Sequence, residues 1–366
     1  MTQVPFHRPE ARLHVTAEDT RPRHRGRSRG RRLAATLPGA IDAYDRLFAA
    51  GGIDPDVVRD DAHRTLDAVN AFRPHLAEQI EGIADGAGVD TWRVAALNAR
   101  TEILARSRTV PPGECSTIVR EVTDAEGRRT HLGVQTWDWH VELSPYWHTI
   151  DSGGGAHRYV GITEHGILAK IGVNSAGLAL HFNILGHQGD RAGGIPMHVL
   201  AALVLEEADH VGHALEILHE APIASSGSFM LFDQARAVLL DLSPAGVFEV
   251  PAVAPGTCLR TNHFLTPTPA QHEKAWLYQP DSGERFTFLK DRLARTRPAN
   301  ADEMLQQLVT GPGEPGVTLL PDMSRELGLR WASLATVHLD PAARIARVLD
   351  GTPAEHGDRP WYDLHA

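Results

Sequence analysis

The spacing of apolar residues changes once along this chain, near residue 115, and that change limits the possible folds more than any other feature. From Gly39 to Arg106, apolar side chains recur every three or four residues, which is typical of helices that pack one face against a core. After residue 115, short runs alternate apolar and polar side chains, and turn-forming residues separate them. This order predicts an α+β fold with antiparallel sheets.

Local signals divide the helical part. Pro74 interrupts the helical pattern and predicts a break between two helices. Asp90 is suited to cap a helix that begins at Thr91. The run from 21 to 32 contains seven arginines and has two interpretations, a basic arm or the solvated start of a helix. Gly26 and Gly30 lie four residues apart and apolar residues follow, so we favour the helix.

The second part of the chain is predicted to alternate between groups of strands and groups of helices. The first five strands are expected to form one antiparallel meander. The predicted strands are 117–122, 131–137, 158–163, 167–173, 178–182, 227–233, 237–242, 247–251, 332–340 and 344–350. The predicted helices are 196–207, 211–220, 285–295 and 300–308.

Composition limits the cellular setting. With 366 residues, 42% of them hydrophobic, the chain can bury a substantial core. A net charge of −10 argues against a nucleic-acid partner, and no run approaches the roughly 18 apolar residues that span a bilayer. The first residues lack the apolar core of a secretory signal. We therefore expect a cytoplasmic protein with neither a nucleic-acid nor a membrane partner.

The chain has only two cysteines, Cys115 and Cys258, which is too few for a disulfide framework. A reducing cytoplasm also disfavours a single bridge, so at least one of them is expected to be a free thiol. We interpret Cys258 as a small core residue. Cys115 follows the loop Pro111-Pro112-Gly113 and begins a strand, so its thiol is expected to be exposed and rigidly held. That makes Cys115 a candidate nucleophile.

Three other polar residues stand at the ends of predicted strands or in irregular segments. Asp138 lies between Trp137 and Trp139, Asn183 follows a strand, and Asn262 precedes His263. Each is a weak signal alone, and Asp138 is equally suited to capping a turn.

Together with Cys115 they form a pattern. The chain resembles the acyl-coenzyme A:6-aminopenicillanic acid acyltransferase family, autoproteolytic cysteine peptidases among the N-terminal-nucleophile hydrolases. The matching segments occur in the family's order and span nearly the whole sequence. They are Arg25–Gly30, Asn98–Glu102, Glu114–Thr117, Gln135–Asp138, Gly172–Leu178, Thr261–His263 and Ser333–Val337.

The resemblance implies a four-layer αββα fold and a precursor that cuts itself before Cys115. The thiol would attack the carbonyl of Glu114, an N-to-S shift would give a thioester, and water would release segments 1–114 and 115–366. The mainly helical first segment and the β-rich second segment would stay associated as one domain. Glu114 stands where the family's penicillin enzyme has glycine, and a carboxylate there would repel a developing oxyanion.

The resemblance also implies roles for other positions. Asp138 would orient the new α-amino group, and Asn262 would donate to the tetrahedral oxyanion. Arg325 is the best match to an arginine near the C-terminus, with Arg330 as the alternative. Asn183 matches an asparagine of the related bile-salt and penicillin amidases.

The implied reaction is hydrolysis of an amide, or transfer of its acyl group to an amine. Its partners would be a small-molecule amide or acyl donor and an amine acceptor; acyl-coenzyme A would be a substrate, and no bound cofactor or metal is expected. Trp137, Trp139 and His263 are candidates for lining the pocket, although tryptophan is also common in cores. Two alternatives stay open: a non-catalytic binding protein, and a metallohydrolase that uses His210 and His213.

Overall fold

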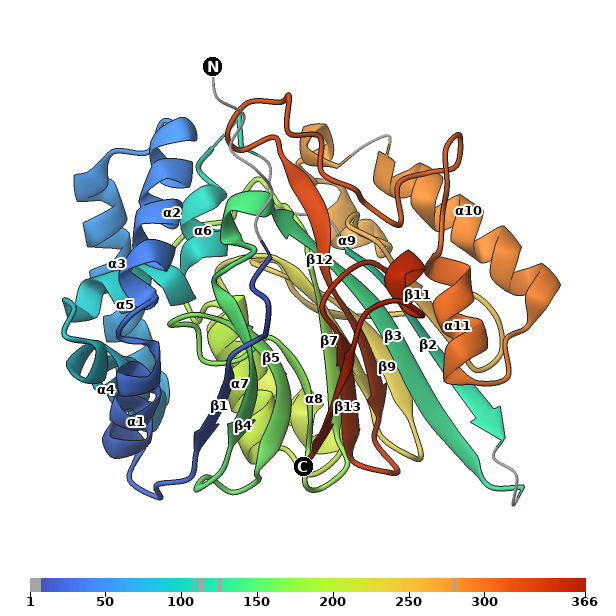
Figure 1. Cartoon of the computed structure of the whole chain (residues 1–366), viewed down its shortest axis with the longest axis horizontal. Coiled ribbons are helices and arrows are strands. Elements are labelled where there is room, and N and C mark those ends of the chain that lie inside the picture. Colours follow the sequence, from blue (N-terminus) through green and yellow to red (C-terminus); the bar gives the residue numbers. More distant parts are fainter. Residues whose placement is uncertain (1–7, 108, 111–114, 124–126, 279–280) are drawn as a thin grey trace.

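The computed structural model describes residues 8–107, 109–110, 115–123, 127–278 and 281–366. These residues form four layers, in which two stacked sheets lie between two layers of helices (Figure 1). The predicted α+β class and the αββα layering are therefore confirmed. Among the described residues, one sheet has eight strands and the other has six.

The eight-stranded sheet has the order β1-β4-β5-β6-β7-β8-β9-β10. Its neighbours pair antiparallel except β1 and β4, which are parallel, so the prediction of purely antiparallel sheets was wrong at this edge. The strands are β1 (His14–Ala17), β4 (Trp147–Ser152), β5 (Tyr159–Glu164), β6 (Ile171–Asn174), β7 (Ala179–Ile184), β8 (Gly227–Phe232), β9 (Ala237–Ser243) and β10 (Gly246–Val250).

The six-stranded sheet is antiparallel, with the order β11-β2-β3-β12-β13-β14. In the pair β2–β3, Cys115 lies opposite Trp137. The strands are β2 (Cys115–Thr123), β3 (Arg129–His140), β11 (Thr257–Arg260), β12 (Trp331–Asp340), β13 (Ile345–Leu349) and β14 (Trp361–His365).

Helices cover the outer faces of both sheets (Figure 1). Helices α1 to α8 lie on the outer side of the eight-stranded sheet, and α10 and α11 cover the six-stranded sheet. The helices are α1 (Pro22–Leu33), α2 (Leu37–Ala50), α3 (Pro55–Phe72), α4 (Pro74–Ala87), α5 (Thr91–Asn98), α6 (Arg100–Leu104), α7 (Met197–Glu207), α8 (Val211–Glu220), the short α9 (Pro267–Ala270), α10 (Asp281–Thr296) and α11 (Ala301–Leu308).

The arginine-rich run forms helix α1, which packs unusually close to α4. A Cβ atom at Gly26 would lie 2.2 Å from the Gln79 carbonyl oxygen, and one at Gly30 would lie 2.1 Å from that of Ile83. The glycine spacing that favoured a helix is therefore also what allows the two backbones to touch. Arg25 is buried and pairs with Glu206 on α7, so this run is structural rather than a basic arm.

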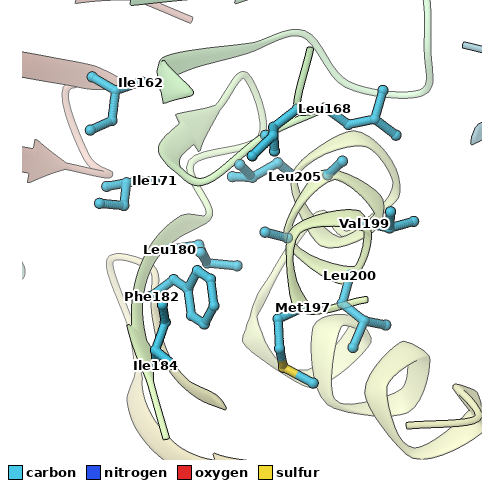
Figure 2. Packing of buried hydrophobic residues seen from close by; sticks show 14 of the residues in the cluster. Ile162, Leu168, Ile171, Leu180, Phe182, Ile184, Met197, Val199, Leu200 and Leu205 are labelled. Atoms are coloured by element: carbon cyan, nitrogen blue, oxygen red, sulfur yellow. The ribbon is translucent and has the colours of Figure 1, made fainter. Parts of the chain in front are cut away.

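Two apolar clusters form the core. The larger contains side chains from both segments 1–114 and 115–366, and Figure 2 shows α7 packing against β5, β6 and β7 within it. The smaller lies between the six-stranded sheet and helices α10 and α11. Strand β2 contributes to both, because Val119 belongs to the first cluster and Ile118 to the second. Side chains therefore alternate between the two faces of β2.

Several predicted elements differ from the structure. The predicted single meander was wrong, because β2 and β3 belong to the six-stranded sheet, whereas β5, β6 and β7 belong to the eight-stranded sheet. The predicted strand 167–173 shortens to β6, since Ile167 and Leu168 lie in a turn that binds the Asn98 and Arg29 side chains. The break at Pro74 is confirmed, and so is the start of α5 at Thr91, although the Asp90 side chain makes no capping bond. Within the described ranges, no helix is both long and apolar enough to cross a membrane.

Candidate active site

Strand β2 presents its first residues to two different layers. Cys115 faces the larger cluster, and the Thr117 hydroxyl on the same face donates to Asn183 Oδ1 on β7 at 2.7 Å. Ser116 faces the opposite way and its Oγ accepts a bond from Arg285 on α10 at 3.0 Å. The start of β2 is thus held from both sides of its sheet.

The Cys115 thiol is buried rather than exposed as the sequence predicted, with 3% of the residue accessible. The reason is tertiary: side chains from β7, from the segment after β11 and from α10 close over the first residue of β2. Cys258 is buried on β11, as expected of a core residue, and both cysteines are free thiols. The predicted loop Pro111-Pro112-Gly113 and Glu114 lie outside the described residues.

Asn262 holds the peptide nitrogen of Cys115. The Cys115 N–H donates to Asn262 Oδ1 at 2.9 Å, and Asn262 Nδ2 donates to the Ile184 carbonyl at 2.9 Å. A peptide N–H can only donate and a carbonyl can only accept, so these partners fix the orientation of the amide. The Ser282 hydroxyl holds the backbone of Asn262 itself, accepting its N–H at 2.7 Å.

Asn183 holds the other end of the same residue. Its Nδ2 donates to the Cys115 carbonyl at 3.0 Å, and its Oδ1 accepts from Thr117 and, at 3.3 Å, from Gln135. Gln135 Nε2 also donates to the Phe182 carbonyl at 2.7 Å, which fixes its own orientation. Both predicted asparagines therefore lie directly on Cys115.

The arginine that contacts Cys115 is Arg285, which sequence reasoning missed. Its guanidinium is buried on α10 and donates to the Cys115 carbonyl at 3.1 Å, to Ser116 Oγ, and to Asn262 Oδ1 at 3.1 Å. A signal was present, because Arg285 lies on the same helix face as Leu289 and Leu293, where an apolar residue is expected. An arginine in that stripe indicates a buried partner.

The arginines proposed from the sequence lie elsewhere. Arg325 is exposed, in the segment between α11 and β12. Arg330 donates to the Arg325 carbonyl at 2.6 Å and forms an ion pair with Glu142 at 3.4 Å. The structure therefore brings Arg285, rather than either of these, to Cys115.

Asp138 is buried on β3, and the Thr136 hydroxyl donates to its Oδ2 at 3.3 Å. Thr136 Oγ1 also accepts the Ser116 N–H at 3.2 Å, so one hydroxyl connects the aspartate to β2.

Burial raises the pKa of the Cys115 thiol to about 12, the Asp138 carboxylate adds to the rise, and Lys170 and Arg285 oppose it. The thiol of this chain is therefore protonated at neutral pH.

The family model for acyl-coenzyme A:6-aminopenicillanic acid acyl-transferases matches residues 125–349. This chain belongs to that family. A relative from Emericella nidulans (strain FGSC A4), the 40 kDa form of acyl-coenzyme A:6-aminopenicillanic-acid-acyltransferase, is 30% identical over 260 residues. The match covers 69% of this chain and 70% of the relative.

Solved structures give more distant likenesses. A variant of conjugated bile acid hydrolase from Clostridium perfringens is 12% identical, with a TM-score of 0.46, and the match covers 67% of this chain and 92% of that one. A Caenorhabditis elegans ortholog of N-acylethanolamine-hydrolyzing acid amidase is 14% identical, with a TM-score of 0.42. The match covers 62% of this chain and 93% of the ortholog.

The three residues proposed to line a pocket lie on different sides of the six-stranded sheet. Trp137 packs edge-on against Trp147 between the sheets, and Trp139 Nε1 donates to the Tyr44 hydroxyl at 2.9 Å. His263 lies beneath α10, where its Nδ1 is 2.8 Å from Ser282 Oγ. Burial, and then the Arg260 and Arg285 charges, lower the pKa of His263 to about 4.

A separate groove of about 370 Å³ lies between α10 and the β2–β11 edge of the sheet. Its lining includes Arg120, Lys290 and Leu293 and none of the residues that contact Cys115. Arg120 is five residues beyond Cys115 on β2, which is roughly 17 Å along an extended strand. The groove is therefore distinct from the site around Cys115.

Proposed function

We propose that this acyltransferase-family protein is an N-terminal-nucleophile enzyme that activates itself by cleavage before Cys115. The Cys115 thiol then attacks an amide or an acyl donor, forms a thioester, and passes the acyl group to water or to an amine. The observation that carries this proposal is that Asn262 binds the nitrogen of Cys115 while Asn183 and Arg285 bind its carbonyl. Such anchoring of one backbone positions a side chain for attack.

Cleavage supplies the missing base. It would turn the Cys115 peptide nitrogen, which now donates to Asn262, into an α-amino group with an ordinary pKa of about 7.7–8.0. That amine takes the thiol proton and becomes an ammonium, and the sulfur becomes a thiolate. Asp138, close enough to affect the thiol, would orient and stabilise the ammonium. A separate histidine base is not required.

Asn262 is also the proposed oxyanion donor. One hydrogen of its Nδ2 binds the Ile184 carbonyl, and the second is the one that would meet the tetrahedral oxyanion. Because Asn262 holds the amine through Oδ1 and the oxyanion through Nδ2, one rigid side chain would fix the distance between base and substrate.

The proposed substrates are a small-molecule amide or acyl donor and an amine acceptor. The printed name of the Emericella nidulans relative pairs acyl-coenzyme A with 6-aminopenicillanic acid, and we propose the same class of chemistry here. Acyl-coenzyme A would act as a substrate and would not remain bound. Segments 1–114 and 115–366 would stay associated after cleavage, because both contribute to the larger apolar cluster.

Intact-mass analysis of the purified chain tests the self-processing step. We expect two fragments, of 114 residues and of 366 − 114 = 252 residues, with Cys115 at the new N-terminus. The fragments should elute together under native conditions. A single uncut chain that still hydrolyses amides would remove self-cleavage from the proposal and leave the thioester chemistry in place.

Alanine at Asn262 or Asp138 is expected to lower turnover at least about tenfold, because each group acts on the amine or the oxyanion. Steady-state rates, measured on mass-verified processed protein, check this. Asn300→Ala is the matched control, since Asn300 only caps the distant helix α11. Rates that match the control would remove the residue concerned from the site.

Arg285→Ala is expected to lower turnover roughly 100-fold, because the Cys115 carbonyl and Asn262 Oδ1 both lose a charged donor. Arg285→Lys should not restore the rate, since one ammonium cannot reproduce the planar set of bonds. Arg325→Ala and Arg330→Ala are the paired comparisons. The sequence-based assignment to Arg325 stays a prediction, and a larger loss in Arg325→Ala than in Arg285→Ala would establish it instead.

A further inference from the structure

A cluster of buried polar and charged side chains lies near the nucleophile, and the proposed reaction does not yet use it. We define it by Tyr44 on α2, Arg100 on α6, Glu164 on β5, Lys170 just before β6 and His198 on α7. All are at most 2% exposed. Glu164 is its centre, because Oε1 accepts bonds from Arg100 and, at 3.2 Å, from Lys170 Nζ, while Oε2 accepts the Tyr44 hydroxyl.

The defined cluster holds more positive than negative charge. Burial would raise the pKa of Glu164, but Arg100 and Lys170 lower it to about 2, so it is ionised. Burial, and then the Arg100 and Lys170 charges, hold the pKa of His198 well below its ordinary value, so that imidazole is neutral. Two cations therefore share one carboxylate.

The next acid along α6 is Glu102, and the hydrogen bonds it makes in the described part of the chain are to groups other than Lys170. Glu102 Oε1 accepts bonds from the Ser225 hydroxyl at 2.6 Å and from the Met197 N–H at 3.0 Å, away from Lys170. Burial raises the pKa of Glu102, and the hydrogen bonds from Ser225 and Met197 act against that rise. Burying a cation without a neighbouring anion lowers the stability of the folded protein.

The Cys115 side chain lies close to Lys170, and its sulfur becomes an anion in the proposed reaction. Lys170 Nζ lies 4.9 Å from the centre of the Trp137 ring, and Trp137 is directly opposite Cys115 in the β2–β3 pair. Residues directly opposite in an antiparallel pair share one face, so the Cys115 side chain points to the same side as that ring. On its other flank, Lys170 lies 5.5 Å from the ring of Phe182, which packs against α7 (Figure 2).

We propose that Lys170 is the counter-ion of the nucleophile: its buried ammonium stabilises the Cys115 thiolate as that thiolate forms and again when the thioester breaks down. The inference rests on the proposed function, because it requires Cys115 to be the nucleophile. Lys170 takes no proton in the step; the thiol proton moves to the α-amino group of Cys115, which becomes an ammonium. Lys170 acts through the sulfur and is therefore a positioning residue.

The electrostatics agree with this geometry. Among the cations that oppose the raised pKa of Cys115, Lys170 has the largest effect, ahead of Arg285 on α10. Burial and then Arg100 lower the pKa of Lys170 to about 8, while Glu164 and Cys115 act to keep it charged. At neutral pH the ammonium is thus still charged. Asp138 on β3 acts in the opposite sense, raising the pKa of the thiol.

Lys170→Met removes the charge and keeps most of the side-chain volume. The variant should fold, because Arg100 and Glu164 remain paired and the surplus charge is gone. In a Cys258→Ala background, the ultraviolet absorbance of the thiolate is followed against pH, with Cys115→Ala as the blank. In processed protein, and at pH values below the Lys170 pKa of about 8, we expect a given thiolate absorbance to be reached about one pH unit higher in Lys170→Met than in the parent.

Two further variants complete the test. Lys170→Arg keeps the charge and should titrate within about 0.3 pH unit of the parent; Lys274→Met is the matched control, since Lys274 is also buried but binds the Ala105 carbonyl. The kcat/KM of Lys170→Met at pH 7 should fall about tenfold, the factor that one pKa unit represents.

An unmoved thiolate titration in Lys170→Met would overturn the inference, even if turnover fell, because a purely structural role would not shift the thiol. A shift of the same size in Lys274→Met would also overturn it. The titration requires no turnover, so failure of the proposed function appears separately, as full activity in Cys115→Ala.

Discussion

Replacing Cys115 with alanine is expected to abolish both self-cleavage and turnover. The thiol is the proposed attacking group in each step. Ser116 points to the opposite face of the sheet, and the Thr117 hydroxyl, on the same face as Cys115, is bound to Asn183 Oδ1. The loss of a nucleophile in other enzymes lowers turnover by about 10⁴-fold or more. Intact mass should show one chain of 366 residues, and amide hydrolysis should fall to background.

Cys258→Ala is the matched control, since it removes the other buried thiol from the neighbouring strand β11. It should be processed and should turn over at the parent rate. Full activity in Cys115→Ala would end the whole assignment to a cysteine nucleophile. Absence of activity in the parent, combined with tight binding of an amide, would instead favour the non-catalytic binding protein.

The layered fold was predictable because the spacing of apolar residues indicates which face of each helix or strand is buried. Most helices and strands begin within a few residues of their predicted positions, and α8 matches its predicted range of 211–220. The division of strands between two sheets was not predictable, because the strands of both sheets alternate in the same way. The turn that separates β3 from β4 sends the chain into another layer, and only tertiary packing decides that.

The candidate site was predictable where chemistry and chain order were distinctive. Cys115, Asn183 and Asn262 meet in the structure. The sequence placed Cys115 at the start of a strand, Asn183 after a strand and Asn262 in an irregular segment, and the family resemblance joined them. Arg285 was missed because its contact with β2 joins residues 170 positions apart in the chain, although its place beside Leu289 and Leu293 on α10 was a signal. The burial of Cys115 was missed for the same reason. Asn262 and Arg285, which cover it, come 147 and 170 positions later in the chain.

Acidification from pH 7 to pH 5 is expected to cost a large part of the free energy of unfolding. Burial lowers the pKa of several imidazoles, to about 3 for His140 and His181 and to about 4 for His165 and His338. In the unfolded chain the same groups have a pKa near 6.5, so between pH 6.5 and 4 the unfolded state binds more protons. Stability therefore falls as the pH falls through that window.

The size of the loss follows from the same linkage. Each such imidazole costs at most about 2 kcal/mol at pH 5, since 1.5 pH units below 6.5 correspond to about 1.4 kcal/mol per unit. Two of them would remove a substantial share of the roughly 5–15 kcal/mol typical of a domain. Asp190 works in the opposite direction, because burial raises its pKa to about 6 and the folded state gains protons there.

Urea unfolding at pH 7 and pH 5, followed by tryptophan fluorescence, measures the effect. His148→Leu isolates one imidazole: burial and then His165 hold its pKa well below the ordinary value, and neither ring nitrogen bonds any described residue. The drop in stability between the two pH values should be about 2 kcal/mol smaller than in the parent. His63→Leu, at an exposed position, should leave the drop unchanged. An equal drop in His148→Leu and the parent would show that the buried imidazoles do not set the acid sensitivity of this fold.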